Sequence, residues 1–314
     1  MLNADFIPII TGPTGSGKSS FSLKLAKEIA EAEPNIIGAD SMQIYKHIDI
    51  GTGKVSVEAQ KKVPHYFISF LDLDEKYNVS EYQEDAMNLI KDLISEDKFP
   101  IVVGGTPQYV TSLVEKTKFM PIKSHPKLRA KLEAKIDEQG GKALLDKLAE
   151  LDPQRASKIH ENDHKRIVRA LEIALTSDYT QGEWDEAEQS IDFPYDFKAF
   201  MFKYERPKLY ARINKRVDLM MEAGLLKEAK QLYELDLPSD TTCLQAIGYK
   251  ELFPYFAGEK DLETVVDDLK IATRHYAKRQ LTWFRNKDWI NYLDPEAPAE
   301  ENIKIVLDSI NYRA

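Results

Sequence analysis

The chain has 314 residues, with 43 lysines and arginines against 52 aspartates and glutamates, so its formal net charge is −9. Hydrophobic residues make up 43% of it, enough for a packed core, and no apolar stretch approaches the roughly 18 residues of a membrane span. Its single cysteine excludes an internal disulfide and a multi-cysteine zinc site, which fits a reducing cytoplasm. The acidic balance argues against non-specific nucleic-acid affinity but not against local basic patches. We therefore expect a cytoplasmic protein of one large or two smaller domains, without a membrane segment or a cleaved signal peptide.

The first motif is the stretch ITGPTGSGKSSF at residues 10–21. An apolar run, FIPII, precedes it, and Phe21, Leu25 and Ile29 follow at helical spacing. Strand, glycine-rich loop and helix form the context that a phosphate-binding P-loop requires. Backbone amides and the helix N-terminus would hold phosphate oxygens, a lysine would add charge, and a serine hydroxyl could bind Mg²⁺. The predicted phosphate-binding residues are Gly12, Pro13, Thr14, Gly15, Ser16, Gly17, Lys18 and Ser19, with Ser19 as the metal ligand.

Strands and helices alternate after this loop. The predicted elements are a strand at 35–41 that ends in Asp40, a strand at 65–73, a helix at 80–96 capped by Ser80, and a strand at 99–106 that ends in Gly-Gly-Thr. Such alternation predicts a parallel sheet whose ligand groups lie at the strand ends. Gly12–Ser19, Asp40 and Gly104–Thr106 should therefore converge on one crevice.

The pattern becomes helical near residue 117. Segments between 125 and 176 stop at Gly140-Gly141 and before Pro153, and a further helix starts at Asn162-Asp163, whereas 177–196 has no clear period. A strand at 197–205 and helices at 207–224 and 264–287 follow. We predict an α/β fold, a P-loop parallel-sheet core with an inserted all-helical domain. The core would comprise residues 1–116 plus 197–314, and the insertion residues 117–196.

A nucleotide kinase or NTPase is the first interpretation of a P-loop. An NTPase should place an acidic residue for Mg²⁺ at the end of a second apolar strand, but IVVGGT ends in Gly-Gly-Thr instead. Asp40 stands where P-loop kinases place the aspartate that handles the acceptor. The residues thus predict a phosphate ester in the loop and an acceptor nucleophile near Asp40, with a helix cap as the structural alternative for this aspartate.

Basic residues point to a large anionic partner. Five lysines and arginines and no carboxylate lie between Arg274 and Lys287, interleaved with aromatic side chains. Lys165, Arg166 and Arg169 lie close together in the helical insertion. A carboxylate-free basic strip in an acidic chain is typical of a surface that follows phosphates. A solvated helix face remains the alternative.

Six stretches together resemble the tRNA dimethylallyltransferase family. They are GPTGSGKS, ADSMQIYKHIDIGTGK, VGGTPQYV, HENDHKRIVRALEI, LQAIGYKEL and TRHYAKRQLTWFRN, in the family's order from residue 12 to residue 286. The resemblance implies that the loop holds the diphosphate of dimethylallyl diphosphate with Mg²⁺. The dimethylallyl group would move to N6 of adenosine 37, just 3′ of the anticodon. A single cysteine leaves no room for the zinc finger of eukaryotic relatives, so we expect a bacterial-type enzyme. We also expect it to act as a monomer.

The resemblance also implies residue roles. Asp40 would accept the N6 proton, Thr106 would orient a substrate, and Lys18 and Arg129 would stabilise the leaving diphosphate. Arg212 and Arg216 are further diphosphate ligands for which a helix-surface role is an equal alternative. The predicted tRNA-binding residues are Asp40, Ser41, Met42, Gln43, Lys165, Arg166, Arg169, Gln245, Gly248, Tyr249, Lys250, Lys278, Arg279, Gln280 and Arg285.

Three other functions remain open at this point. A prenyltransferase that acts on free adenine nucleotides would share the loop and Asp40 but would not need the insertion. A small-molecule kinase would turn over ATP, and a non-enzymatic P-loop switch would bind RNA and nucleotide without prenyl transfer. Two departures from the family's usual pattern, Lys165 and Pro107-Gln108, leave one RNA contact and the wall of the prenyl pocket undefined.

Overall fold

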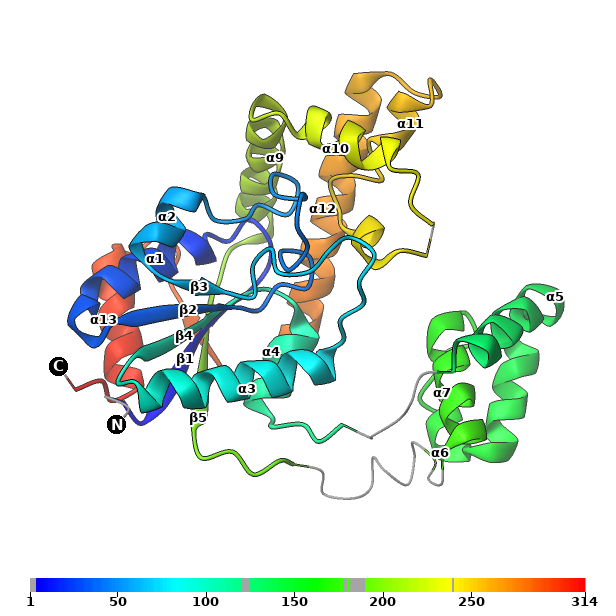
Figure 1. Cartoon of the computed structure of the whole chain (residues 1–314), viewed down its shortest axis with the longest axis horizontal. Coiled ribbons are helices and arrows are strands. Elements are labelled where there is room, and N and C mark those ends of the chain that lie inside the picture. Colours follow the sequence, from blue (N-terminus) through cyan, green and yellow to red (C-terminus); the bar gives the residue numbers. More distant parts are fainter. Residues whose placement is uncertain (1–3, 120–124, 178–179, 181–189, 239, 314) are drawn as a thin grey trace. The chain divides into compact units, whose positions relative to one another are not determined.

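The structure is a computed structural model that describes residues 4–119, 125–177, 180, 190–238 and 240–313 (Figure 1). The chain divides into two compact units. Unit 1 comprises Met1–Lys116 with Phe193–Ala314, and unit 2 comprises Thr117–Asp192. Unit 1 contains the sheet, and unit 2 is helical.

Unit 1 is built on one six-stranded sheet in the order β3-β2-β4-β1-β5-β6. The strands are β1 (Phe6–Thr11), β2 (Pro34–Gly38), β3 (His65–Tyr66), β4 (Phe99–Val103), β5 (Asp196–Phe202) and β6 (Ile290–Leu293). Every pairing is parallel, and the register sets Ile10 of β1 opposite both Val103 and Phe200. The loops after β1, β2 and β4 therefore leave the same edge of the sheet, as predicted for the α/β core.

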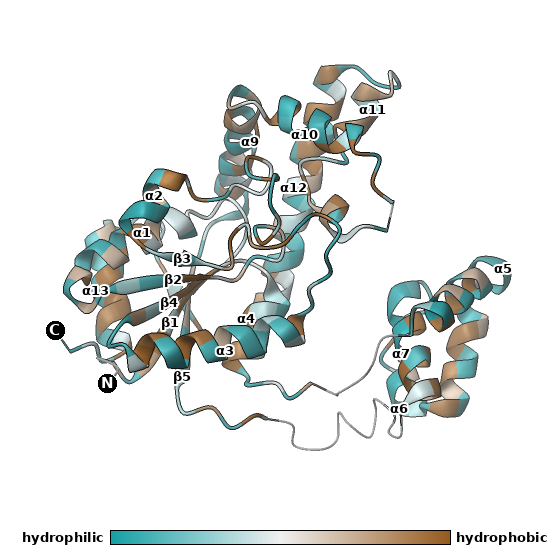
Figure 2. Ribbon diagram, viewed as in Figure 1, coloured by the Kyte–Doolittle hydropathy of each residue, from teal (hydrophilic) through white to brown (hydrophobic). Residues whose placement is uncertain are grey.

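Helices cover both faces of this sheet (Figure 1). On one face, α1 (Lys18–Glu28) and α13 (Ala299–Ser309) share a buried apolar cluster that includes Phe21, Leu25, Ile303 and Val306. The opposite face carries α3 (Val79–Ser95) and α4 (Pro107–Val114). This division follows from right-handed crossovers, because β1-to-β2 and β3-to-β4 run in opposite directions along the sheet. Figure 2 shows hydrophobic strands between amphipathic helices.

Between β5 and β6 the chain forms a further group of helices. They are α9 (Arg206–Glu222), α10 (Leu225–Glu234), α11 (Phe253–Phe256) and α12 (Leu262–Phe284), with a 3-10 turn at Thr242–Gln245. Val217, Leu232 and Leu269 of this group pack with Ile44 and Tyr45, which belong to the loop after β2. These helices thus form a wall beside the sheet edge where β2 ends.

Unit 2 consists of α5 (Pro126–Leu151), α6 (Pro153–Ala156) and α7 (His164–Thr176). Its own buried core includes Leu132, Leu148, Ile167 and Leu171. The predicted break at Gly140-Gly141 is confirmed, because α5 consists of two helical segments that meet at a kink, where Gly140 has φ 80° and ψ 159°. Glycine adopts this non-helical backbone with positive φ without the steric cost that a Cβ would bring.

Several local predictions differ from the structure. The strand predicted at 65–73 stops at Tyr66, because Phe67 and Ser69 have φ of 57° and 52°. The helix predicted to be capped by Ser80 is capped by Asn78, which forms a capping box with Glu81. Strand β6 and helix α13 were not predicted. Part of the predicted loop at 177–196 lies outside the described residues. Within those residues, no helix is both long enough and apolar enough to cross a membrane.

Candidate active site

A cavity of about 940 Å³ lies at the sheet edge where β1, β2 and β4 end. The P-loop, the loop after Asp40, α9 and α12 all contribute to its lining. Asp40 is the sole carboxylate among the described lining residues. The basic lining residues are Lys18, Lys24, Lys27, Lys54, Arg216, Lys250 and Arg279. Such a balance favours an anionic ligand.

The P-loop has a backbone that only glycines adopt easily. Gly12, Gly15 and Gly17 have φ of 127°, 78° and 89°. A Cβ at Gly12 would also lie 2.8 Å from Cγ of Met201, on the neighbouring strand β5. Helix α1 starts at Lys18 with no side-chain cap and no acidic residue in its first turn, within the part of the chain described. Its first amides are therefore left for an external anion.

Lys18 is folded back onto this loop. Its Nζ donates hydrogen bonds of 2.8 Å to the carbonyls of Gly12 and Pro13, which leaves one ammonium donor for a ligand. Burial lowers the pKa of Lys18 to about 8; the charge of Asp40 raises this pKa and that of Arg216 lowers it further. An anion in the cavity would restore the charged form.

Asp40 and Thr106 meet where β2 and β4 end. The amide of Met42 donates to Oδ1 of Asp40 at 3.0 Å, and Thr106 Oγ1 accepts from the amide of Ser41 at 2.9 Å. The next helix starts only at Val57, so Asp40 closes a turn and the helix-cap alternative is wrong. Tyr276 of α12 faces this pair: burial raises its pKa, the charge of Asp40 adds to the rise, and a hydrogen bond with Thr106 opposes it. Tyr276 is one of the aromatic residues interleaved with the basic strip, but it was not among the predicted site residues.

Arg216 of α9 lines the cavity. Burial lowers the pKa of this guanidinium, and the charge of Asp40 opposes the change. A Cβ on Gly53 would lie 1.7 Å from its terminal nitrogen, so glycine at 53 makes room for the arginine. No carboxylate among the described residues forms an ion pair with Arg216. The structure thus resolves the two interpretations of Arg216 in favour of the cavity.

Arg212, one turn earlier on α9, lies outside the cavity. Its Nε donates to the carbonyl of Gly15 at 3.0 Å, and its guanidinium lies 5.2 Å from the ring centroid of Tyr204. Arg212 therefore supports the P-loop through the Gly15 carbonyl, and its predicted contact with the diphosphate stays a prediction. One helical turn separates an arginine that faces the ligand space from one that braces the loop.

Two of the side chains predicted to bind tRNA are buried. Gln280 is 2% exposed; its Oε1 accepts from the amide of Thr14 at 2.9 Å, and its Nε2 donates to the carbonyl of Gly105 at 2.6 Å. It ties the P-loop to the Gly-Gly turn. Tyr249 is fully buried and donates to Glu228 at 2.7 Å. Both side chains hold protein segments together, and their predicted role in tRNA binding stays a prediction.

Other members of the predicted tRNA set lie on the surface. Lys278, Arg279 and Arg285 of α12 are exposed, as are Gln245 and Lys250, while Gly248 is buried. A recess on α12 is lined by His275, Lys278, Arg279, Thr282, Trp283 and Lys287. Trp283 is 38% exposed, so a basic and aromatic surface does exist on this helix.

Unit 2 contains the remaining predicted cations. Arg129 and Arg169 each pair with Glu172, at 2.8 and 2.7 Å, and the Glu172 side chain is fully buried. Burial alone would raise the pKa of Glu172, but hydrogen bonds from Arg129, the His125 amide and Arg169 leave it lowered. Arg166 pairs with Asp163 at 3.3 Å, and Lys165 is exposed. All three arginines therefore have a carboxylate partner inside their own unit.

Comparison with known proteins accounts for this combination of features. The family model described as IPP transferase matches residues 43–287. A tRNA dimethylallyltransferase from Acetivibrio thermocellus is 41% identical over 308 residues, covering 96% of this chain and 97% of that protein. The enzyme of the same name from Bacillus subtilis is 40% identical over 298 residues, covering 95% and 93%.

Solved structures agree with this result. A full-length tRNA isopentenylpyrophosphate transferase from Bacillus halodurans aligns with a TM-score of 0.70 at 37% identity, over 98% of this chain and 96% of that one. A eukaryotic dimethylallyltransferase described as acting on tRNA gives 0.82 at 30% identity, over 99% and 81%. The resemblance seen in the sequence motifs is thereby confirmed. The chain belongs to the IPP transferase family.

Proposed function

We infer that the chain transfers the dimethylallyl group of dimethylallyl diphosphate to N6 of adenosine 37 in tRNA. The observation that carries this inference is the cavity beside the P-loop. Its described lining contains seven lysines and arginines but only one carboxylate, that of Asp40. A cavity of this kind takes an anion from one side and offers one base to a neighbouring nucleophile. The relatives named tRNA dimethylallyltransferase supply the identity of the two substrates.

The diphosphate binds in the P-loop. Its oxygens take hydrogen bonds from the loop amides and the first turn of α1, while Lys18 and Arg216 supply positive charge from two sides. Negative charge builds on the diphosphate as the allylic C1–O bond breaks, so these fixed cations stabilise the departing group.

Mg²⁺ fits this site through few protein ligands. The described residues contain no cluster of three His, Cys, Asp or Glu side chains that could hold a metal by themselves. Ser19 and Asp40 do place two oxygen-bearing side chains on the cavity wall, and Mg²⁺ commonly takes one or two protein oxygens together with phosphate oxygens and water. When bound with the diphosphate, the ion would further neutralise the leaving group. We propose Ser19 as its protein ligand.

The acceptor amine approaches from the side of Asp40. A bond forms from N6 to C1 of the dimethylallyl group, the C1–O bond breaks, and diphosphate leaves. The amine must lose a proton, and Asp40 accepts it. Thr106 holds the Ser41 amide, which fixes the start of the segment Ser41–Gln43 that lines the cavity beside the base. Because the amine lies on a stacked loop base, the adenosine must be turned out to reach this point.

The tRNA anticodon stem-loop binds across exposed cations. In unit 1 these are Lys278, Arg279 and Arg285, with Gln245 and Lys250 beside the cavity. In unit 2 we assign Lys165, Arg166 and Arg169 to the RNA, and Arg129 to the diphosphate. Arg129 and Arg169 would bind these ligands through the guanidinium N–H groups that do not pair with Glu172. The substrate pair implies a cytoplasmic reaction, and we propose that one chain suffices for it.

One assay tests this function. Protein, Mg²⁺, labelled dimethylallyl diphosphate and an unmodified anticodon stem-loop with A37 should yield labelled RNA, and a matched stem-loop with G37 should not. Free AMP as acceptor tests the nucleotide-specific prenyltransferase, and ATP tests the kinase. Label in AMP in preference to RNA, or ATP hydrolysis that depends on the acceptor, would contradict the proposal.

A further inference from the structure

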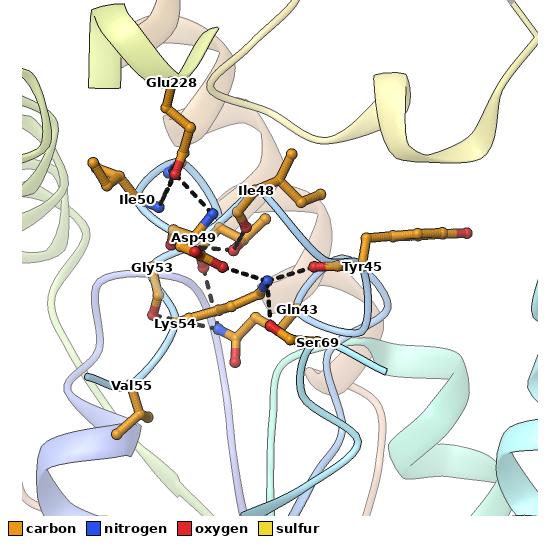
Figure 3. A network of polar contacts seen from close by, with 12 residues as sticks. Gln43, Tyr45, Ile48, Asp49, Ile50, Gly53, Lys54, Val55, Ser69 and Glu228 are labelled. Carbon is orange, nitrogen blue, oxygen red and sulfur yellow. Dashed lines mark hydrogen bonds and ion pairs between the residues drawn. The ribbon is translucent and has the colours of Figure 1, made fainter. Parts of the chain in front are cut away.

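The loop from Ser41 to Ser56 forms the acceptor side of the cavity, yet it contains no helix or strand. It consists of successive turns between Asp40 and α2. Figure 3 shows the polar contacts that hold it. Gln43 lies at its start, and its Nε2 donates to the carbonyls of Thr52 at 3.1 Å and Gly53 at 3.4 Å near its end. Among the described residues, its Oε1 is the amide atom left for a ligand.

Glu228 holds this loop from outside. The carboxylate belongs to α10, far from the loop in the sequence. It accepts hydrogen bonds of 2.9 to 3.0 Å from the backbone amides of Asp49, Ile50 and Gly51 (Figure 3). It also accepts the hydroxyl of Tyr249 at 2.7 Å. Successive backbone amides that point into one concavity make an anion site, and here a side chain of the protein fills it.

Lys54 holds the same loop from inside. Its side chain is 4% exposed, and its Nζ pairs with Asp49 at 2.6 Å and donates to Ser69 Oγ at 2.8 Å (Figure 3). A further hydrogen bond goes to the carbonyl of Tyr45. These partners use all three donors of the ammonium group. Lys54 therefore stabilises the interior of the loop and has no donor left for a substrate.

Close packing at Gly51 fixes how the loop 41–56 approaches Glu228 and Tyr249. A Cβ on Gly51 would lie 2.6 Å from the ring of Tyr249, so a glycine lets the loop reach both the tyrosine and the glutamate. Neighbouring Gly53 leaves the space that Arg216 occupies. A displaced loop would move Gln43 and its partners Thr52 and Gly53 together.

We propose that Glu228 is a positioning residue for the acceptor adenosine. By fixing the amides of Asp49, Ile50 and Gly51, it sets the position of Gln43, whose free Oε1 accepts a hydrogen bond from the exocyclic amine of the base. This inference rests on the proposed function, in which the segment Ser41–Gln43 receives adenosine. Glu228 itself touches no reacting atom. Its loss should therefore affect the acceptor and spare the diphosphate, which binds to other elements.

The test is Glu228→Gln, measured against Glu251→Gln. Glu251 is a matched control, because it accepts the amide of Gly248 at 2.9 Å in the same helical group but does not contact residues 49–51. For Glu228→Gln we expect kcat/KM for the stem-loop to fall roughly 10- to 100-fold, because the variant loses charge-assisted hydrogen bonds that position a reactant. The Kd for dimethylallyl diphosphate should change less than threefold. For the control, both values should stay within about threefold of wild type.

Gly51→Ala gives a second, independent perturbation from the loop side. Its Cβ would push the loop off Tyr249 while Glu228 remains, so the same split between acceptor and donor is expected. Equal behaviour of the two glutamate variants, or a parallel loss of donor and acceptor binding, would overturn the proposal. If Glu228→Gln does not fold, the result for Gly51→Ala decides. A wild-type protein without prenyl transfer would instead contradict the proposed function, independently of either variant.

Discussion

The basic side chains of the cavity and those of the helical insertion differ in the carboxylates available to neutralise their charge. Lys18 and Arg216 line a cavity whose sole described carboxylate is Asp40, and burial lowers the pKa of both. In unit 2, Arg129 and Arg169 share the fully buried Glu172. A buried cation without a counter-ion is costly unless a ligand supplies one, whereas a paired cation already stabilises the fold. The difference separates cations that need a ligand to supply a counter-charge from cations that already have a carboxylate partner in the fold, although both kinds occur in the sequence motifs.

The largest effect should come from Asp40→Asn, which removes the sole carboxylate from the described cavity lining. Asn keeps the shape and accepts the Met42 amide, but cannot take up the proton of the attacking amine. The single-turnover rate of prenyl transfer should fall by roughly 10²–10⁴, the usual range for loss of a general base. Binding of the stem-loop and of dimethylallyl diphosphate should change little. Near-normal turnover would leave stabilisation of the leaving diphosphate as the main catalytic contribution.

A matched pair on α9 tests whether the cavity arginine binds the diphosphate. Arg216→Gln should weaken the affinity for dimethylallyl diphosphate by about 10- to 100-fold, because a charge-assisted contact is lost. Arg212→Gln should leave that affinity within roughly threefold, since Arg212 bonds to the Gly15 carbonyl and is not among the residues that line the cavity. Isothermal titration calorimetry measures both. Equal losses would mean that the position relative to the cavity does not decide the role.

In unit 2 the corresponding test is Glu172→Gln. Removing the shared carboxylate leaves two arginines without their partner, and we expect a loss of about 1–3 kcal/mol, less than for a fully buried pair because both arginines are partly exposed. Native-state hydrogen exchange should show the loss in α5 and α7, with the donor affinity unchanged. Since the pKa of Glu172 is lowered in the folded state, its contribution should also disappear as pH falls through that pKa.

Lys18 should make donor binding depend on pH. In the free site its pKa is about 8, and a bound diphosphate raises it, so binding above pH 8 takes up a proton. The affinity for the unreactive saturated analogue, isopentyl diphosphate, should fall by up to about tenfold per pH unit from pH 8 to 9.5, where the ligand's own charge is constant. Calorimetry in two buffers of different ionisation enthalpy counts the proton. An affinity that stays flat to pH 9.5 would show that Lys18 remains charged without ligand.

The convergence of Gly12, Asp40 and Gly104 was predictable, because parallel strands end at one edge of a sheet. The partners of side chains far apart in the chain were not. Gln280 bonds with Thr14, 266 positions away, so its role depends on how α12 is rotated. A signal did exist: Gln280 lies at helical spacing with buried Ala277 and Phe284, which indicates the inward face of α12.

Glu228 shows the same signal, because it lies three positions after buried Leu225 and four before buried Leu232 of α10. That spacing indicates the face of the helix but not the contact, since its three amide partners belong to a loop about 180 residues earlier. The strand predicted at 65–73 failed for a different reason. Its apolar composition is that of a strand, but tertiary packing places Phe67 and Ser69 in left-handed conformations that end the ladder.

The smallest expected effect concerns the exposed cations of α12, which have neither a buried partner nor a place deep in the cavity. Neutralising Lys278 and Arg285 together should flatten the dependence of stem-loop affinity on salt by up to about two units of log–log slope, because each released phosphate contact contributes about one unit. Lys287 is the matched control: it lies on the same surface but already pairs with Glu115 at 2.5 Å, so Lys287→Gln should change the slope less than either other cation. The affinity for dimethylallyl diphosphate should stay constant in both variants. If the double variant keeps the wild-type slope, these side chains form only a solvated helix face, and the RNA must be bound by cations elsewhere. Lys287→Gln could instead change the salt slope as much as its neighbours do. In that case an ion-pair partner does not decide whether a cation on this surface binds the RNA. The contrast between Arg216 and Arg129 would then need another explanation.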